Sequence, residues 1–214
     1  MGGQSFQIIV LLVLAVVIFL RLSKELGKRD GHEPALDKRE RPLKVVSDNT
    51  QVHVPDEIIE VDSNGATQAI DRAKQIEPQF RLDNFLQGSK SAYEMILMAF
   101  LNGEMSTVKS FVDAAVYEGF EDAIEARVAA GHNMEAKFLG IKDVSLKHAD
   151  FDEVSKELTL GVEFISELTR AVTDAKGKVI EGSKTKAETE IDVWHFARVM
   201  GSDNPNWELV ATGE

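Results

Sequence analysis

The chain has 214 residues, contains no cysteine and carries a formal net charge of −12. The lack of cysteine excludes disulfide bonds, cysteine-based zinc sites and thiol nucleophiles, and the net acidity argues against nucleic acid as a partner. A chain of this length suits one or two domains with one substantial core.

The first element in chain order is a thirteen-residue apolar run, Ile8–Leu20. With its flanks it reaches the short end of the range for a membrane-spanning helix, which is about 17–25 residues. A cleaved signal peptide would need basic residues before the run and a small-x-small site after it, and neither occurs. The sequence therefore predicts an uncleaved transmembrane anchor over residues 1–22, and the positions representing it are Ile8, Leu12, Val16 and Leu20.

A basic collar follows the anchor. Residues 21–44 carry eight basic and five acidic side chains, whereas no charged side chain precedes Arg21. Basic residues flanking one end of a span stay on the cytoplasmic side, so the N-terminus is expected outside and the rest of the chain in the cytoplasm. Basic residues beside a membrane also attract anionic lipid, and we expect this contact from Arg21, Lys24, Lys28 and Arg29.

Residues 23–65 have the composition of a flexible charged tether. No aromatic residue occurs between residues 20 and 79, and four of the five prolines lie there. Such a segment cannot bury enough apolar area to offset the entropy lost on ordering. A short amphipathic helix is expected at Ala66–Glu77, within a connection over 66–79, and its apolar face could lie on the folded domain or on the membrane.

From residue 80 to 214 the pattern is that of an α+β domain. Leu82–Asn102 has helical spacing, with Asp83 as the expected cap and Gly103 as the expected end. A second helix is expected from about Ser106 to Gly131. Apolar residues then alternate, which predicts strands within Glu135–His148, around Leu158–Phe164, from a turn at Thr173–Lys178 to Val199, and at Trp207–Thr212.

The segment Asp192–Thr212 reads as a β-hairpin around an Asn-Pro-Asn turn. It contains both tryptophans of the chain, Trp194 and Trp207, which could stack on or near each other across the hairpin. Buried aromatic residues usually serve packing. We therefore expect Trp207 to be a core residue and not a binding contact.

Catalytic and metal motifs are missing from the sequence. The five histidines have no metal-binding spacing, and neither a phosphate loop nor a nucleophile elbow occurs, so no metal or cofactor is expected. The nearest candidates for acid–base chemistry are Asp192, His195 and Tyr93. On an ideal strand Asp192 and His195 point to opposite faces, which favours a structural reading.

The same C-terminal stretch resembles the Tim44-like domain family. The resemblance rests on Trp194-His195-Phe196, the loop Asp203–Trp207 and the ending Leu209–Thr212, together with a first helix that contains Phe85-Leu86-Gln87-Gly88 and Ala99-Phe100. It covers about residues 80–214, although the inserted Asn204 departs from the family pattern. The signature positions are Phe85, Gly88, Phe100, Trp194, Phe196, Pro205 and Trp207.

The resemblance implies a cone-shaped fold of the cystatin or nuclear-transport-factor type, with helices on a curved antiparallel sheet. The mitochondrial member of the family is a scaffold at an import channel. With an anchor of its own, this chain looks like the bacterial, TimA-type membrane-anchored members. The expected function is a non-catalytic adaptor at the inner membrane, linked to protein translocation or membrane-protein biogenesis. The alternatives are a module that binds a lipid or apolar ligand in the cone and, less favoured, an isomerase-like or dehydratase-like enzyme.

Overall fold

A four-stranded antiparallel sheet follows three α-helices in residues 63–213, the part of the chain that the computed structural model describes. The strands occur in the order β1-β2-β3-β4, so each pairs with its neighbour in sequence. This arrangement confirms the α+β class. The helices are α2 (Ser63–Ile76), α3 (Leu82–Asn102) and α4 (Ala114–Ala129), and the strands are β1 (Asn133–Phe151), β2 (Glu157–Thr173), β3 (Val179–Val199) and β4 (Glu208–Thr212).

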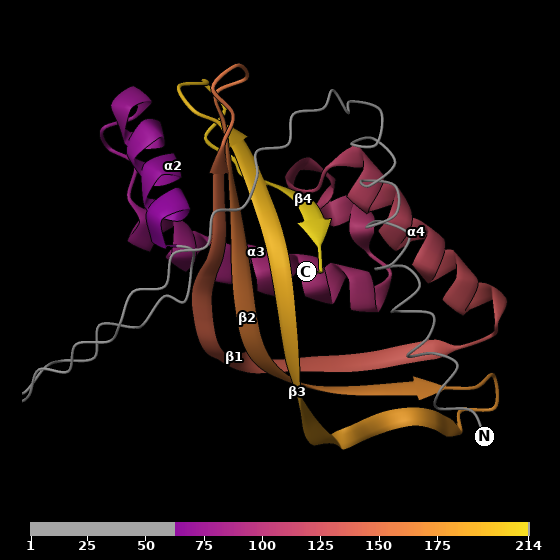
Figure 1. Cartoon of the computed structure of the whole chain (residues 1–214). Helices are drawn as coiled ribbons and strands as arrows, with labels where there is room; N and C mark the ends of the chain where they lie inside the picture. The colour runs from indigo at the N-terminus through magenta and orange to yellow at the C-terminus, as the bar shows by residue number, and fades with distance from the viewer. Residues whose placement is uncertain (1–62, 214) are drawn as a thin grey trace, which may run out of the picture.

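The sheet is strongly bent, and α3 and α4 lie on its concave side while α2 lies beside β1 (Figure 1). Bulges account for the curvature, because an extra residue in one strand bends it and increases its twist. The pairing of β1 with β2 shifts register at three places between Phe138 and His148. The pairing of β2 with β3 skips residues 184–187 of β3 beside Leu168–Arg170.

The core lies between α3 and the concave face of β2 and β3. The alternation predicted in β2 is confirmed, since every second residue from Leu158 to Phe164 is fully buried. Tyr93 and Ile96 of α3 are also fully buried, and Trp194 and Phe196 of β3 complete this face. The expected strand within Glu135–His148 is β1, which extends beyond that range at both ends.

The hairpin turn predicted at Thr173–Lys178 is confirmed. Asp174 accepts hydrogen bonds through Oδ1 from the backbone N–H groups of Lys176 and Lys178, each at 2.9 Å, and Gly177 has a φ of 78°. Aspartate stabilises turns through such bonds, and glycine adopts positive φ without steric cost. The β1–β2 turn is built in the same way around Asp152, whose Oδ1 accepts from Val154 and Ser155.

Two expectations for helix ends were wrong. Asp83 does not cap α3: it lies in the first turn and pairs with Arg81, which holds the N-cap position without a capping bond. The second helix starts at Ala114 and not near Ser106. The residues before it form two 3₁₀ turns, Met105–Thr107 and Lys109–Phe111, followed by Val112 in extended backbone.

The reason for the late start of α4 is a contact with β4. Val112 forms a parallel bridge with Leu209, and the N–H of Asp113 donates to the carbonyl of Leu209 at 2.9 Å. The Asp113 side chain then caps α4 by accepting from Ala115. Apolar residues three apart fit 3₁₀ turns as well as an α-helix, so the pattern alone could not distinguish them.

Candidate functional site

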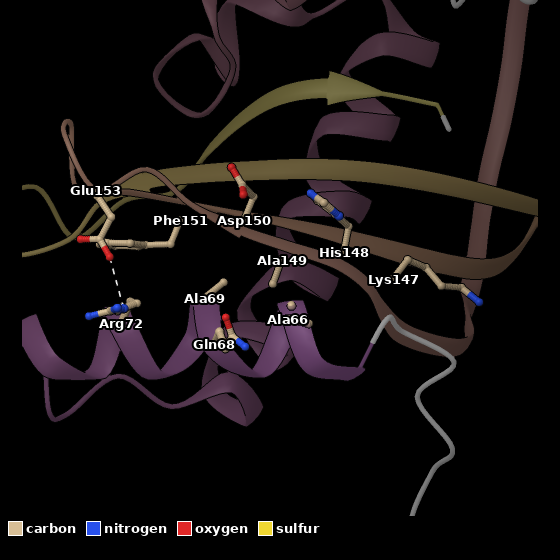
Figure 2. Close-up of a pocket in the computed structure, with 11 residues that line it drawn as sticks. Ala66, Gln68, Ala69, Arg72, Lys147, His148, Ala149, Asp150, Phe151 and Glu153 are labelled. Carbon is tan, nitrogen blue, oxygen red and sulfur yellow. Dashed lines mark ion pairs between the residues drawn. The ribbon is translucent and has the colours of Figure 1, made fainter. Parts of the chain in front are cut away.

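A groove of about 470 Å³ lies between α2 and the edge strand β1 (Figure 2). One wall comes from the N-terminal half of α2 and the other from the last part of β1 and the turn after it. Its volume falls within the range of sites that hold a ligand or a peptide side chain. The lining residues are Gly65, Ala66, Gln68, Ala69, Arg72, Lys147, His148, Ala149, Asp150, Phe151 and Glu153.

Small side chains explain why α2 lies close to the strand. Ala66, Ala69 and Ala73 repeat at helical spacing and are buried against the sheet, with Ile70 packed beside them. A helix is therefore present near the expected range Ala66–Glu77, but α2 begins earlier, at Ser63, and so includes the last three residues of the expected tether. Because alanine side chains are small, α2 can approach β1 closely and still leave a groove beside the contact.

The groove combines an apolar floor with a polar rim. Ala69, Ala149 and Phe151 provide apolar surface, while an ion pair between Arg72 Nε and Glu153 Oε1, 3.2 Å apart, crosses one end (Figure 2). Both partners of this pair are more than half exposed, so it adds little stability. Such a surface can hold an extended peptide segment.

The three candidates for catalysis separate in the structure. Tyr93 Oη donates to Asp192 Oδ2 and lies 3.0 Å from Ser166 Oγ. His195 lies elsewhere, over Gly161, with its ring centroid 6.2 Å from that of His148. Within residues 63–213, no three histidine, aspartate or glutamate side chains are arranged to hold a metal ion.

The Tyr93–Asp192 pair serves packing better than chemistry. The Tyr93 ring is fully buried and stacks on Phe164 at a centroid distance of 4.4 Å, with Trp194 at 4.7 Å. Burial and the nearby Asp192 carboxylate raise the pKa of Tyr93. Burial raises the pKa of Asp192, although the hydrogen bond from Tyr93 and the charge of Arg170 oppose that rise. The hydroxyl thus stays protonated and donates a hydrogen bond to a partly buried carboxyl group.

The two tryptophans occupy different clusters and do not pair across the hairpin, contrary to expectation. Trp194 packs with Tyr93 and Phe164, whereas Trp207 lies before β4 and packs on Phe85 at 4.5 Å and Phe80 at 6.0 Å. Trp207 packs against the core, as its expected packing role requires, but it is only partly buried and lies at the edge of that core.

A polar clamp joins the end of α2 to the β3–β4 loop beside Trp207. Glu77 Oε2 accepts from Arg198 Nη2 at 2.5 Å, and Glu77 Oε1 accepts from the N–H of Gly201 at 2.7 Å. The Arg198 guanidinium also lies 5.3 Å from the centroid of the Trp207 ring, within the range of a cation–π contact. The stretch around Trp207 thus ties α2 and the start of α3 to the sheet.

The other signature positions divide between core and surface. Phe85 and Phe196 are buried and meet edge to face at 6.1 Å, and Phe100 packs on Phe120 at 5.0 Å. Gly88 and Pro205 are exposed, and a Cβ added at Gly88 would meet nothing within 4 Å.

The expected anchor and the collar, including Ile8, Leu12, Val16, Leu20, Arg21, Lys24, Lys28 and Arg29, fall outside the described residues. Among residues 63–213, no helix is both long enough and apolar enough to cross a membrane.

One buried cation was not anticipated. Arg127, in the last turn of α4, is 7% exposed, and burial lowers its pKa. Its Nη1 donates to the sulfur of Met134 at 3.3 Å, and it has no carboxylate partner among residues 63–213. Its Nη2 lies at the C-terminal end of α3, beside Gly103. A helix C-terminus stabilises a cation by about 0.3–1 kcal/mol and at most ~2 kcal/mol. An unpaired charge that is fully buried costs several kcal/mol. The Nε and Nη2 atoms of Arg127 are not among the fully buried atoms without a hydrogen-bond partner in residues 63–213, so water relieves part of that cost.

Comparisons with known proteins identify relatives of the domain. The Tim44-like domain matches residues 66–214. The "Mitochondrial import inner membrane translocase subunit TIM44" of Mus musculus is 27% identical over 138 residues, and that of Homo sapiens is 28% identical over 138 residues. Each alignment covers 63% of this chain but only 30% of the relative.

Among solved structures, the intermembrane space region of the chloroplast protein ARC6 matches 72% of this chain and 96% of its own. The identity is 11% and the TM-score 0.36. The domain match, in contrast, spans well over half of the chain and includes α2 as well as the sheet. This chain belongs to the Tim44-like domain family.

Proposed function

We propose that this chain is a non-catalytic, membrane-anchored adaptor that holds a protein partner at the cytoplasmic face of a bacterial inner membrane. Residues 1–22 form the anchor, and a tether follows it as far as the start of α2. This short helix and its connection lead to residues 80–214, a domain of the cone-shaped cystatin or nuclear-transport-factor type. The collar contacts anionic lipid. The naming of the relatives as subunits of an import translocase supports a role in protein translocation or membrane-protein biogenesis.

The observation that carries this proposal is the groove between α2 and β1. Its α2 wall begins at Gly65, near the first residues that the structure describes, and the expected anchor precedes them in the sequence. A partner bound there would be kept near the membrane without any chemistry, because tethering raises its local concentration.

The packing of the concave face disfavours the two alternatives. Tyr93, Phe164, Trp194 and Phe196 fill the space between α3 and the sheet, with ring centroids 4.4 to 6.4 Å apart. An apolar ligand in this part of the cone would have to displace those rings. An enzyme that used Tyr93 would need it to reach a substrate, and the Tyr93 ring is fully buried with its hydroxyl bonded to Asp192.

Two measurements test the membrane part of the proposal. The full chain should stay in the membrane fraction after alkaline carbonate extraction. A phosphatase that is active only outside the cytoplasm, fused after Glu214, should be inactive. Release by carbonate would contradict the anchor, and high phosphatase activity would show that the topology is inverted.

Site-specific photo-crosslinking tests the groove. A photoreactive residue at Gln68, on the groove wall, should give a discrete protein adduct in membranes, whereas one at exposed Gln87 of α3 should not. Removal of residues 1–22 should weaken the Gln68 adduct, since the partner is then no longer concentrated at the membrane. Equal adducts from both positions, or an adduct that is independent of the anchor, would argue against the proposed adaptor.

A further inference from the structure

We infer that Arg127 is the binding residue of a site for a singly charged oxyanion, located where the C-terminal ends of α3 and α4 meet the start of β1. The site lies apart from the α2–β1 groove, which uses the other end of β1. The inference does not depend on the proposed adaptor function.

The pairing of the arginines carries the inference. Residues 63–213 contain five arginines, and four of them form ion pairs: Arg72 with Glu153, Arg81 with Asp83, Arg170 with Glu190 and Arg198 with Glu77. Arg72 and Arg81 are more than half exposed and need a partner least. Arg127, which is 7% exposed, has no carboxylate among the described residues. Because the cost of an unpaired charge rises with burial, the residue that most needs a counter-ion lacks one.

The hydrogen bonds of Arg127 are also incomplete. A guanidinium has five N–H donors in a planar fork. The bond that Arg127 makes among residues 63–213 goes to the thioether of Met134, which is a weak acceptor. The remaining donors are suited to a carboxylate or a phosphate group, which accept two parallel bonds from one arginine.

The charge balance and the surroundings narrow the ligand class. The one guanidinium of Arg127 is neutralised by one negative charge, which fits a carboxylate or a phosphodiester better than a doubly charged phosphate monoester. Met134 contacts the guanidinium, and Ile124 lies beside Gly103 next to it. These apolar side chains would tolerate an apolar group attached to the anion. A carboxylate side chain and the phosphodiester of a lipid headgroup share this chemistry.

Thermal unfolding of the full-length chain with acetate and with dimethyl phosphate tests the site, using sodium chloride at equal ionic strength as the reference. One arginine and a ligand of a few atoms give a dissociation constant of roughly 1 mM or weaker. Acetate at ten times its dissociation constant should raise Tm by about 3–6 °C. A larger shift with acetate indicates a carboxylate ligand, and a larger shift with dimethyl phosphate indicates a phosphodiester.

Arg127→Met removes the charge while keeping apolar bulk. It should abolish the anion-dependent rise in Tm without lowering Tm in chloride, because an unpaired buried charge is lost. The matched control Arg81→Met, at an exposed arginine, should keep the full anion response. An equal rise in wild type and Arg127→Met, or no rise in wild type, overturns the inference.

If Arg127→Met fails to fold, Met134→Leu decides. This change removes the thioether contact and keeps the volume nearly constant. The anion response should then persist or increase, since one more N–H becomes available to the ligand. If Met134→Leu loses the anion-dependent rise in Tm, the guanidinium serves the packing of α4 on β1 and the inference is overturned.

Discussion

Replacement of Trp207 by alanine measures how firmly the C-terminal stretch joins α2 and α3 to the sheet. The ring contacts Phe80, Phe85 and the Arg198 guanidinium, but it is only half-buried. A fully buried tryptophan costs about 3–5 kcal/mol when truncated to alanine. Because Trp207 is only partly buried, we expect a smaller cost of about 2–4 kcal/mol, which lowers Tm by about 4–16 °C in a domain of this size.

Urea and thermal unfolding of the full chain check this value, and two other variants calibrate it. Trp194 is 4% exposed, so Trp194→Ala should lower the free energy of unfolding by the full amount of about 3–5 kcal/mol. Asn206→Ala should change stability by less than about 0.5 kcal/mol, because Asn206 is exposed and its φ is not positive. A Trp207→Ala protein with unchanged Tm that no longer forms the Gln68 adduct would refute the packing role and make Trp207 a partner contact.

Three further predictions concern single residues. Gly182→Ala should lower the free energy of unfolding in urea by more than about 3 kcal/mol, because Gly182 has a φ of 69° and an added Cβ would lie 2.1 Å from a carbonyl oxygen of β2. The control Gly177→Ala should lower it by only about 1–2 kcal/mol, because Gly177 has a φ of 78° but open space around it. Burial alone would raise the pKa of Glu77, but the bonds from Arg198 and a backbone N–H bring it below its ordinary value. The stability that Glu77 provides is therefore present above its ordinary pKa and is lost as pH falls through the lowered value, so Glu77→Gln should lower Tm at pH 7 and flatten the acid limb of the curve of Tm against pH. Burial raises the pKa of Asp192, so the wild-type protein loses stability as pH rises through that pKa. Asp192→Asn should therefore raise Tm at pH 7 more than at acidic pH. An equal change in Tm at both pH values would contradict this.

The elements that the sequence predicts well are those whose pattern is local. Strand β2 is buried at every second residue from Leu158 to Phe164, and that alternation is visible without any partner strand. The turn before β3 has its own Asp174 and Gly177. The start of α4 could not be predicted in the same way, because Val112 is held extended by Leu209, almost a hundred residues later.

The candidate sites are harder to predict because they depend on partners that are distant in sequence. The alanines of α2 indicate a buried small-residue face, but nothing in their spacing identifies β1 as the surface they meet. Arg198 and Glu77 are 121 residues apart, and Arg72 meets Glu153 across 81 residues. An arginine can be recognised as unpaired only when the partners of the others are known. Arg127 therefore became distinctive through the pairing of four other arginines, and not through any feature of its own segment.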